Sequence, residues 1–242
     1  MDINIQNETS RLKSVILGIA DDMGPPLDIN PVSKSHMENG TYPAQVDIQR
    51  ELLTVEAALV AEGVKVFRPQ NIKGTDQIFT RDIGFVIDHK FVISNMKESV
   101  RQKELPGIKD ILAEIPEPNI LLPPGGAIIE GGDVILHDEH VLVGISKRTN
   151  WAGYEFIKQA FPNKKVHALP LVVTDSPDTN ILHLDCAFQP VGDHNAIIYE
   201  EGFIAKPEII YQLFKEEDLI KVDIDQKQRM FPNVFSVSPD KV

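Results

Sequence analysis

Three short motifs carry acidic residues at even spacing along the chain. Phe79-Thr80-Arg81-Asp82, Glu130-Gly131-Gly132-Asp133 and Leu182-His183-Leu184-Asp185 each open an apolar, hairpin-like segment. Their aspartates lie 51 and 52 residues apart. A recurrence of that length is typical of repeat architectures, in which equivalent points of successive units can converge on one axis. The spacing therefore predicts that acids and a histidine from distant stretches of the chain meet in one pocket.

The residue types in this pocket indicate a cationic ligand. Asp82, Glu130 and Asp185 would lie together, and like charges raise each other's pKa unless a cation or a proton lies between them. A guanidinium group is planar, permanently charged and rich in N–H donors, so carboxylates in its plane can bind it bidentately. His183, beside the central carbon of such a group, could protonate a departing amine and then activate water.

Each of these residues also has a purely structural interpretation. Aspartates at strand starts often form turns, and Asp133 suits that role best because it follows two glycines. His183 taken alone could be an ordinary buried residue whose hydrogen bonds are satisfied. A metal ion held by His183, Asp185, Glu130 and Asp133 is an alternative, although H-x-D is a weak ligand signature. The glycine pairs lack the lysine of a phosphate-binding loop. We predict neither a metal nor a cofactor.

The single cysteine is a poor candidate for a nucleophile. If the chain is a strand here, His183 and Asp185 share one face, and Cys186 lies on the opposite, apolar face. Buried thiols usually act as small apolar side chains. Cys186 is therefore predicted to be structural.

Composition narrows the function classes. The chain of 242 residues is 42% hydrophobic, which suffices for one domain, residues 1–242. Its formal charge of −12 repels phosphate backbones and anionic lipid, so we expect neither nucleic-acid nor membrane partners. A lone cysteine and the lack of a signal-peptide pattern suit a cytoplasmic protein. The oligomeric state stays open, a homo-oligomer included.

The elements that must position the motifs follow a repeated order. Unit one reads as a strand at Leu12–Ile19, a long irregular loop at Gly24–Pro43, a helix at Gln45–Ala61 and a strand at Val64–Phe67. Units two, three and four each read as strand, strand, helix, strand. The predicted ranges are Ile83–Ile87, Phe91–Ser94 and Ile108–Ile115 for unit two; Val134–Leu136, Val141–Ile145, Trp151–Phe161 and Val166–Leu171 for unit three; and Leu182–Phe188, Ala196–Tyr199, Pro207–Phe214 and Leu219–Val222 for unit four.

A fifth unit begins but does not finish. Val234–Ser238 alternates apolar and polar residues like a first strand, and Val242 follows without a helix or closing strand. Natural chains usually cover such a strand, because unpaired edges promote aggregation. We therefore expect the chain to be a C-terminally truncated form of a five-unit protein.

These motifs, together with Gly144-Ile145-Ser146-Lys147-Arg148-Thr149-Asn150, resemble the guanidino-modifying enzymes over nearly the whole chain. That superfamily comprises arginine deiminases, dimethylarginine dimethylaminohydrolases and amidinotransferases, and the likeness is closest to the second group. The resemblance implies an α/β fold, namely a five-bladed α/β propeller (pentein). It also implies Asp82, Glu130 and Asp185 as guanidinium ligands, His183 as general acid/base, and Arg148 as an anchor for the substrate carboxylate.

One departure from the family pattern concerns the nucleophile. The family keeps its cysteine near the end of the fifth unit, and Cys186 does not correspond to it. The leading hypothesis is that the complete protein hydrolyses arginine or a methylated arginine to a citrulline-type product through a cysteine-bound intermediate. The alternatives are amidine transfer to an amine acceptor, or silent guanidine binding if the chain naturally ends at Val242.

Overall fold

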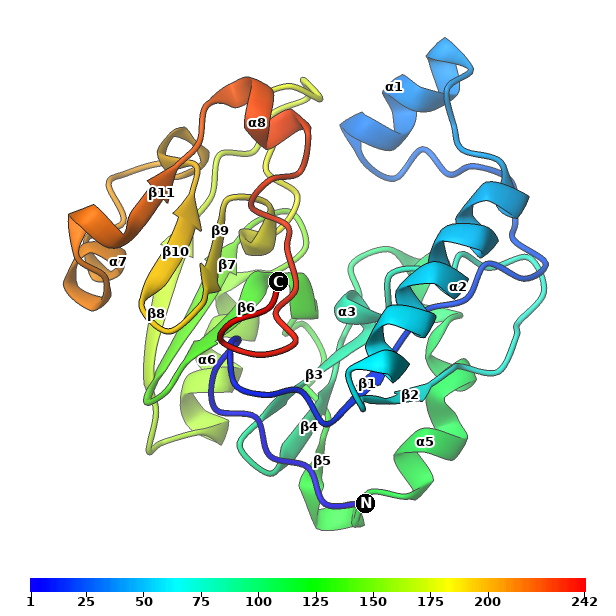
Figure 1. Cartoon of the computed structure of the whole chain (residues 1–242), viewed down its shortest axis with the longest axis horizontal. Coiled ribbons are helices and arrows are strands. Elements are labelled where there is room, and N and C mark those ends of the chain that lie inside the picture. Colours follow the sequence, from blue (N-terminus) through cyan, green and yellow to red (C-terminus); the bar gives the residue numbers. More distant parts are fainter.

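The computed structural model describes all 242 residues, Met1–Val242. Its strands form four small sheets, three with three strands and one with two. In Figure 1 the sheets follow one another in sequence order around the middle of the molecule, from β1 and β2 on the right to β9, β10 and β11 on the upper left. The strands are β1 (Ser14–Ile16), β2 (Lys65–Phe67), β3 (Gly84–Ile87), β4 (Lys90–Ile93), β5 (Ile120–Leu121), β6 (Val134–His137), β7 (His140–Ile145), β8 (Lys165–Pro170), β9 (Phe188–Val191), β10 (Asn195–Ile198) and β11 (Leu219–Lys221).

The helices connect the strands, and many are short. Several are single turns of 3-10 helix, a form that suits short connecting pieces. The α-helices are α1 (Pro31–Asn39), α2 (Gln45–Ala61), α3 (Thr80–Ile83), α4 (Ser99–Gln102), α5 (Lys109–Ala113), α6 (Trp151–Ala160), α7 (Glu208–Leu213) and α8 (Ile224–Gln228). The 3-10 helices are η1 (Leu105–Ile108), η2 (Glu117–Asn119), η3 (Gly131–Asp133), η4 (Leu184–Cys186), η5 (Glu200–Gly202) and η6 (Glu216–Asp218).

The three larger sheets share one topology, which confirms the predicted repeat. In each, the first two strands form an antiparallel hairpin, and a third strand pairs with the second in parallel after a helical connection. The parallel pairs are β4 with β5, β7 with β8, and β10 with β11. Parallel neighbours need such a crossover because no tight turn can join them. Units two, three and four thus correspond to β3–β5, β6–β8 and β9–β11.

The first sheet contains part of the same unit. Strands β1 and β2 pair in parallel, and α2 connects them along the chain. This arrangement matches the second and third strands of the other units, without an antiparallel first strand. The structure therefore confirms an α/β fold of repeated units, whereas closure of five units into a propeller stays a prediction.

Three local predictions were wrong. The predicted loop Gly24–Pro43 contains α1, because Asn30 caps that helix, Pro31 begins it, and Gly40, with φ +64°, ends it. The predicted strand Leu182–Phe188 is instead the turn η4 followed by β9. The predicted strand Val234–Ser238 forms no ladder. It has an isolated bridge from Ser238 to Lys241 and a bond from the Leu12 N–H to the Val237 carbonyl, which is too little pairing for a strand.

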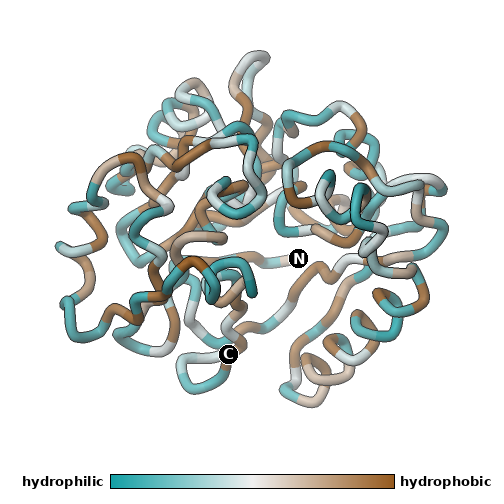
Figure 2. Tube along the Cα trace, turned by 90° about the horizontal axis from the view of Figure 1, so that it is seen from above, coloured by the Kyte–Doolittle hydropathy of each residue, from teal (hydrophilic) through white to brown (hydrophobic).

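The hydrophobic core is divided along the same repeat. The largest buried cluster joins units three and four, the second joins units two and three, and the third lies mainly in unit two. Repeat proteins are stabilised in this way, by contacts between neighbouring units. Figure 2 shows hydrophobic stretches running through the interior strands and hydrophilic ones in many of the peripheral loops. None of the helices combines the length and the apolar character that a bilayer crossing requires.

An N-terminal segment, residues 3–10, crosses the hairpins of units two and three. Ile5 forms an antiparallel bridge with Asp88, and Asn7 forms one with His137. The Asn7 side chain also donates a hydrogen bond of 2.9 Å to Asp138. The segment is therefore fixed to two units that lie far away in sequence.

Candidate functional site

The three motifs fold into three short helical turns rather than strand starts. Helix α3 contains Asp82, η3 follows Glu130, and η4 follows His183 and contains Asp185. Each turn directly precedes the first strand of its unit or lies one residue before it. Turn α3 contacts η3, and η3 contacts η4. The repeat therefore brings the motifs together, as predicted, through turns that pack on one another.

His183 lies at the centre of this cluster. Its Nε2 is 3.0 Å from Glu130 Oε2, and its Nδ1 is 3.7 Å from Asp82 Oδ1. The side chain is buried. Burial alone would lower the pKa of His183, but the carboxylates of Asp82, Glu130, Asp133 and Asp185 outweigh it and raise the pKa to about 10. The imidazole is thus a cation held between carboxylates at neutral pH.

Glu130 is fully buried and has three partners. Its Oε1 accepts a hydrogen bond of 3.0 Å from the Lys97 backbone N–H. Its Oε2 accepts one of 3.3 Å from Arg148 Nη1 and lies 3.0 Å from His183. A buried carboxylate needs this degree of pairing, because an isolated charge is costly away from water.

Asp82 is bound by an arginine that the sequence analysis missed. Arg101 Nη1 donates a hydrogen bond of 2.6 Å to Asp82 Oδ2, and its other nitrogens bind both oxygens of Glu104 at 2.9 Å. Burial raises the pKa of Asp82, but His183 and Arg101 outweigh it, so the pKa lies below its usual value. Arg101 belongs to the charged stretch after β4, which carries no motif, so spacing alone could not single it out.

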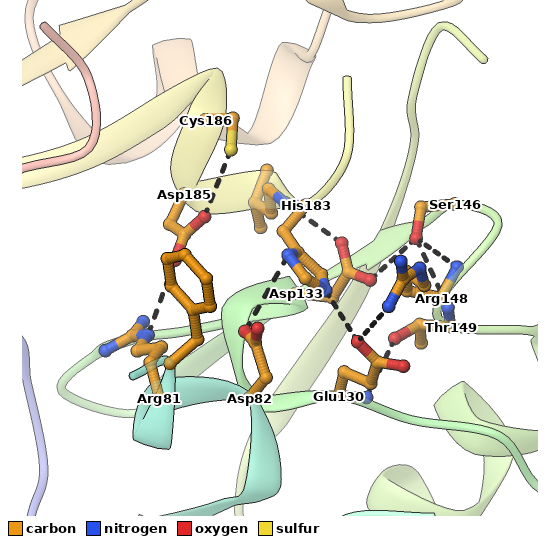
Figure 3. A network of polar contacts seen from close by, with 12 residues as sticks. Arg81, Asp82, Glu130, Asp133, Ser146, Arg148, Thr149, His183, Asp185 and Cys186 are labelled. Carbon is orange, nitrogen blue, oxygen red and sulfur yellow. Dashed lines mark hydrogen bonds and ion pairs between the residues drawn. The ribbon is translucent and has the colours of Figure 1, made fainter. Parts of the chain in front are cut away.

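Asp185 joins the site through weaker contacts. Its Oδ2 lies 3.6 Å from Arg81 Nε, and its Oδ1 accepts a hydrogen bond of 3.5 Å from the Cys186 thiol. Burial raises the pKa of Asp185, and the nearby Arg81 and His183 counteract only part of that rise. In Figure 3, Arg81 and Asp185 lie on one side of His183, with Glu130 and Arg148 on the other.

Arg148 lies inside the same network. Its guanidinium is buried, and Nη1 binds Glu130 while Nη2 donates a hydrogen bond of 3.0 Å to the Ile29 carbonyl. Ile29 belongs to the segment Gly24–Pro43, which was predicted to be a long loop. The structure therefore places Arg148, the predicted carboxylate anchor, next to Glu130, with one bond to that segment.

Asp133 lies in the η3 turn, as expected, and its side chain also makes tertiary contacts. It is fully buried, and its two oxygens accept hydrogen bonds from Ser146 Oγ at 2.7 Å and from the Leu184 N–H at 2.9 Å. Burial raises its pKa to about 7, against the opposing effect of His183 and Ser146. Asp133 thus links unit three to η4, which carries His183 at its start.

Cys186 is half-buried in the η4 turn, and its thiol contacts Asp185 instead of lying on the opposite face as predicted. It packs against the largest core cluster. Burial, followed by the neighbouring Asp185 carboxylate, raises its pKa well above the usual value. A thiol in such surroundings carries little thiolate, the form that attacks electrophiles.

The geometry of three residues would also permit a metal ion. Donor atoms of Asp82, Glu130 and His183 lie within 4.8 Å of one another. However, Arg101 and Arg148 already supply positive charge to the two carboxylates, and both nitrogens of His183 face them. The residues present therefore form an ion-pair network instead of a free ligand set. That the protein binds no metal stays a prediction.

Comparisons with known proteins show similarity in sequence and in fold. The chain is 32% identical over 234 residues to the uncharacterized protein YkgA of Bacillus subtilis, covering 96% of this chain and 77% of YkgA. The structure resembles SxtG, an amidinotransferase of Microseira wollei, at 18% identity with a TM-score of 0.78, covering 98% and 83% of the two chains. It also resembles the N-terminal domain of ArgZ, a cyanobacterial arginine dihydrolase, at 21% identity with a TM-score of 0.79, covering 93% and 80%.

A family model decides the assignment. The model described as N,N dimethylarginine dimethylhydrolase, eukaryotic, matches residues 43–241, which include all the predicted site residues. This span covers well over half of the chain. The chain therefore belongs to the N,N-dimethylarginine dimethylhydrolase family, within the guanidino-modifying superfamily.

Proposed function

We propose that this protein acts on the guanidino group of arginine or a methylated arginine and hydrolyses it to a citrulline-type product. One observation carries the proposal. Three buried carboxylates, Asp82, Glu130 and Asp185, surround one buried imidazole, His183, and they come from three equivalent turns of the repeat. The family assignment and the arginine-cleaving activity in ArgZ's name support the same substrate class.

The carboxylates are already oriented toward guanidinium groups. Arg101 binds Asp82 and Arg148 binds Glu130, so each acid meets a guanidinium of the protein itself. Asp185 has no hydrogen bond to an arginine. A substrate guanidinium would bind Asp185 first and share Asp82 and Glu130 with their internal partners. Bidentate pairing of this kind would hold the guanidinium carbon in a fixed orientation.

His183 would supply and recover the proton. As an imidazolium, with its pKa at about 10, it holds the proton that a departing amine requires. A thiolate would attack the guanidinium carbon and form a C–S bond, and the C–N bond would break as the amine takes that proton. Water would then add to the same carbon, giving one proton back to His183 and the other to solvent or to the departed amine, and the C–S bond would break to release the thiolate and the ureido product.

The thiolate of this scheme is not assigned to Cys186, whose pKa is raised and whose thiol donates to Asp185. The sequence-based hypothesis places the nucleophile in a fifth propeller unit, and that part of it stays a prediction. Arg148 is proposed as the anchor of the substrate carboxylate. A carboxylate would replace the Ile29 carbonyl at Nη2, since Nη1 is held by Glu130. We also propose that residues 1–242 form a single domain and that the protein is cytoplasmic.

Calorimetry with arginine, monomethylarginine and dimethylarginine tests the binding step. We expect binding to the parent chain and its loss in Asp82→Asn, which keeps the shape of the side chain and removes its charge. Asp193→Asn, an equal change in an exposed turn, should bind like the parent. If none of these guanidines binds the parent, the proposed site is wrong.

Assays for the ureido product with the same guanidines test turnover. A new guanidino compound that forms only when an amine acceptor such as glycine is supplied would instead support amidine transfer. Binding without any turnover would support a silent guanidine-binding role.

A further inference from the structure

The carboxylate of Asp185 differs from the other two acids of the site in its internal bonding. Asp82 accepts a hydrogen bond of 2.6 Å from Arg101, and Glu130 accepts one of 3.3 Å from Arg148. Asp185 has Arg81 beside it at 3.6 Å, and the buried Nε of Arg81 has no hydrogen-bond partner. The two side chains thus form an ion pair that lacks a hydrogen bond. Another contact must keep Arg81 from approaching Asp185 more closely, because an arginine and a carboxylate normally form short, paired hydrogen bonds.

Two other groups hold the guanidinium of Arg81. Nη1 donates a hydrogen bond of 3.1 Å to Glu8 Oε2, and Nη2 donates one of 3.0 Å to the Val134 carbonyl. Glu8 is therefore the second carboxylate within reach of this arginine, and it competes with Asp185 for the charge.

Glu8 is itself fixed from three directions. Its Oε1 accepts a hydrogen bond of 3.0 Å from the Leu136 N–H, and its Oε2 also lies 3.4 Å from Gln189 Nε2. Its side chain is 11% exposed. The N-terminal segment that carries Glu8 is bridged to the hairpins at Asp88 and His137. Glu8 lies outside residues 43–241, which the family model matches.

Arg81 also has space into which it could move. A cavity of about 160 Å³ is lined by Arg81, Asp185 and Gln189 together with residues 233–235. Packing alone therefore does not fix the distance between Arg81 and Asp185. The hydrogen bonds to Glu8 and to the Val134 carbonyl can fix it, and of these two acceptors only Glu8 carries a charge that competes with Asp185.

We propose that Glu8 is a positioning residue that holds Arg81 away from Asp185 and so keeps Asp185 available for the guanidinium of the substrate. The inference rests on the proposed function, in which Asp185 is a guanidinium ligand. Without the charge of Glu8, Arg81 moves onto Asp185, forms paired hydrogen bonds with it and competes with the substrate. The unneutralised arginine also repels a cationic ligand.

Calorimetry with arginine and with dilute guanidinium chloride tests this role. Guanidinium has no carboxylate for Arg148 to bind, so its affinity depends on the carboxylates of the site alone. Glu8→Gln keeps an acceptor for the Leu136 N–H and removes the charge. We expect its Kd for both ligands to rise about tenfold, or roughly 1.4 kcal/mol. Glu8→Asp, which keeps the charge, should recover part of the affinity. Asp2→Asn removes a carboxylate that is 96% exposed near the start of the same end of the chain, and this variant should bind like the parent.

A double-mutant cycle distinguishes positioning from general support of the fold. If Glu8 acts through Arg81, then Glu8→Gln should have no further effect on the Kd in an Arg81→Gln background. An equal loss of affinity in both backgrounds overturns the inference. Thermal unfolding of each variant identifies any that fail to fold.

A crystal structure of Glu8→Gln tests the movement without any ligand. We expect Arg81 within hydrogen-bond distance of Asp185, with a matching change in the ¹⁵N resonance of Arg81 Nε in solution. If Arg81 keeps its 3.6 Å separation from Asp185, the inference is wrong whatever the ligand affinities. If the parent binds no guanidine but Arg81 moves as expected, the proposed function fails while the assigned role of Glu8 toward Arg81 stands.

Discussion

His183 Nε2 lies 3.0 Å from Glu130 Oε2, and both side chains are buried. A neutral imidazole could form one such hydrogen bond, but here the second nitrogen also faces a carboxylate, Asp82, at 3.7 Å. Both nitrogens can donate only in the imidazolium form. The geometry and the raised pKa of His183 therefore lead to the same protonation state. The acid/base residue of the proposed reaction is ready to donate before substrate arrives.

This pairing predicts a pH dependence of stability. The pKa of His183 rises from 6.5 to about 10 on folding, because the surrounding carboxylates outweigh burial. A group whose pKa is raised on folding contributes stability that is fully present below its unfolded pKa and is lost as the pH rises through its folded pKa. We expect the free energy of unfolding to fall between pH 6.5 and about pH 10.

Urea unfolding at a series of pH values measures this fall in the parent and in His183→Gln. The variant keeps a hydrogen-bonding side chain without a titrating charge, so its decline over the same range should be smaller. His194→Gln, in an exposed turn, should follow the parent. Identical profiles for the parent and His183→Gln would contradict the charged state of His183.

Arg101 should be among the most costly residues to remove. It binds the buried carboxylates of Asp82 and Glu104, and Arg101→Ala leaves Glu104 without its cation and Asp82 with only His183 at 3.7 Å. Loss of one partner from a buried ion pair typically costs about 3–5 kcal/mol. Arg50→Ala, which breaks an exposed pair with Asp47, should cost less than about 1 kcal/mol. Denaturant unfolding compares the two.

A second variant tests the reason for that cost. Glu104 has its pKa raised to about 7 by burial, so it is poorly stable as a charge without Arg101. Adding Glu104→Gln to Arg101→Ala removes one uncompensated carboxylate. The double variant should therefore be more stable than the sum of the two single changes. Simple additivity would show that the carboxylates do not depend on Arg101.

Asp133 should tolerate replacement by asparagine but not by alanine. Asp133→Ala leaves the Leu184 N–H without its acceptor, and an unsatisfied buried donor costs about 1–3 kcal/mol. Asp133→Asn can still accept from Leu184 and donate to Ser146. Because burial raises the pKa of Asp133 to about 7, the parent loses stability as the pH rises toward 7, which the neutral asparagine does not. Unfolding experiments below and above pH 7 should show that Asp133→Asn gains stability relative to the parent as the pH rises.

The repeat could be predicted from sequence because its signals are local and periodic. The helix Gln45–Ala61 was predicted with its observed bounds, since apolar residues recur at helical spacing and Gly63 follows. The hairpins of units two and three also match closely, because each has two short apolar runs joined by a polar turn. The strand predicted at Leu182–Phe188 failed because the packing of η4 on η3 overrides the alternating pattern of residues there. Such a tertiary contact leaves no periodic signal.

The site could be predicted only in part for a similar reason. His183, Asp82, Glu130 and Arg148 lie in one ion-pair network, and Asp185 lies beside it with Arg81 as its ion-pair partner. Arg101 and Glu8 act through contacts 19 and 73 residues away in sequence, and neither belongs to a motif. Long-range ion pairs have no characteristic spacing, so they appear only once the chain is folded.

Cys186 should react slowly with thiol reagents in the folded protein. Its thiol donates a hydrogen bond to Asp185, and burial raises its pKa well above the usual value. Ellman's reagent at neutral pH should therefore modify the native chain much more slowly than it modifies the chain in urea, where one thiol per chain should react. Fast modification of the native protein would return Cys186 to the list of candidate nucleophiles.

Gly132 provides a test of how tightly the site is packed. A Cβ at this position would lie 2.8 Å from His183 Cγ and 2.9 Å from Asp82 Oδ1, closer than side-chain carbons approach other atoms. Neither neighbour can give way easily, because His183 is held by Glu130 and Asp82 is held by Arg101. Overpacking of a buried site typically costs about 1–3 kcal/mol. Gly132→Ala should show that loss in denaturant unfolding, together with weaker arginine binding in calorimetry.

Gly125→Ala is the matched control for this change. No atom lies within 4 Å of a Cβ at Gly125, so the same added methyl group meets open space there. Its stability and arginine affinity should equal those of the parent. If Gly132→Ala also behaves like the parent, then His183 and Asp82 can separate freely, and the fixed geometry on which the proposed chemistry depends is absent.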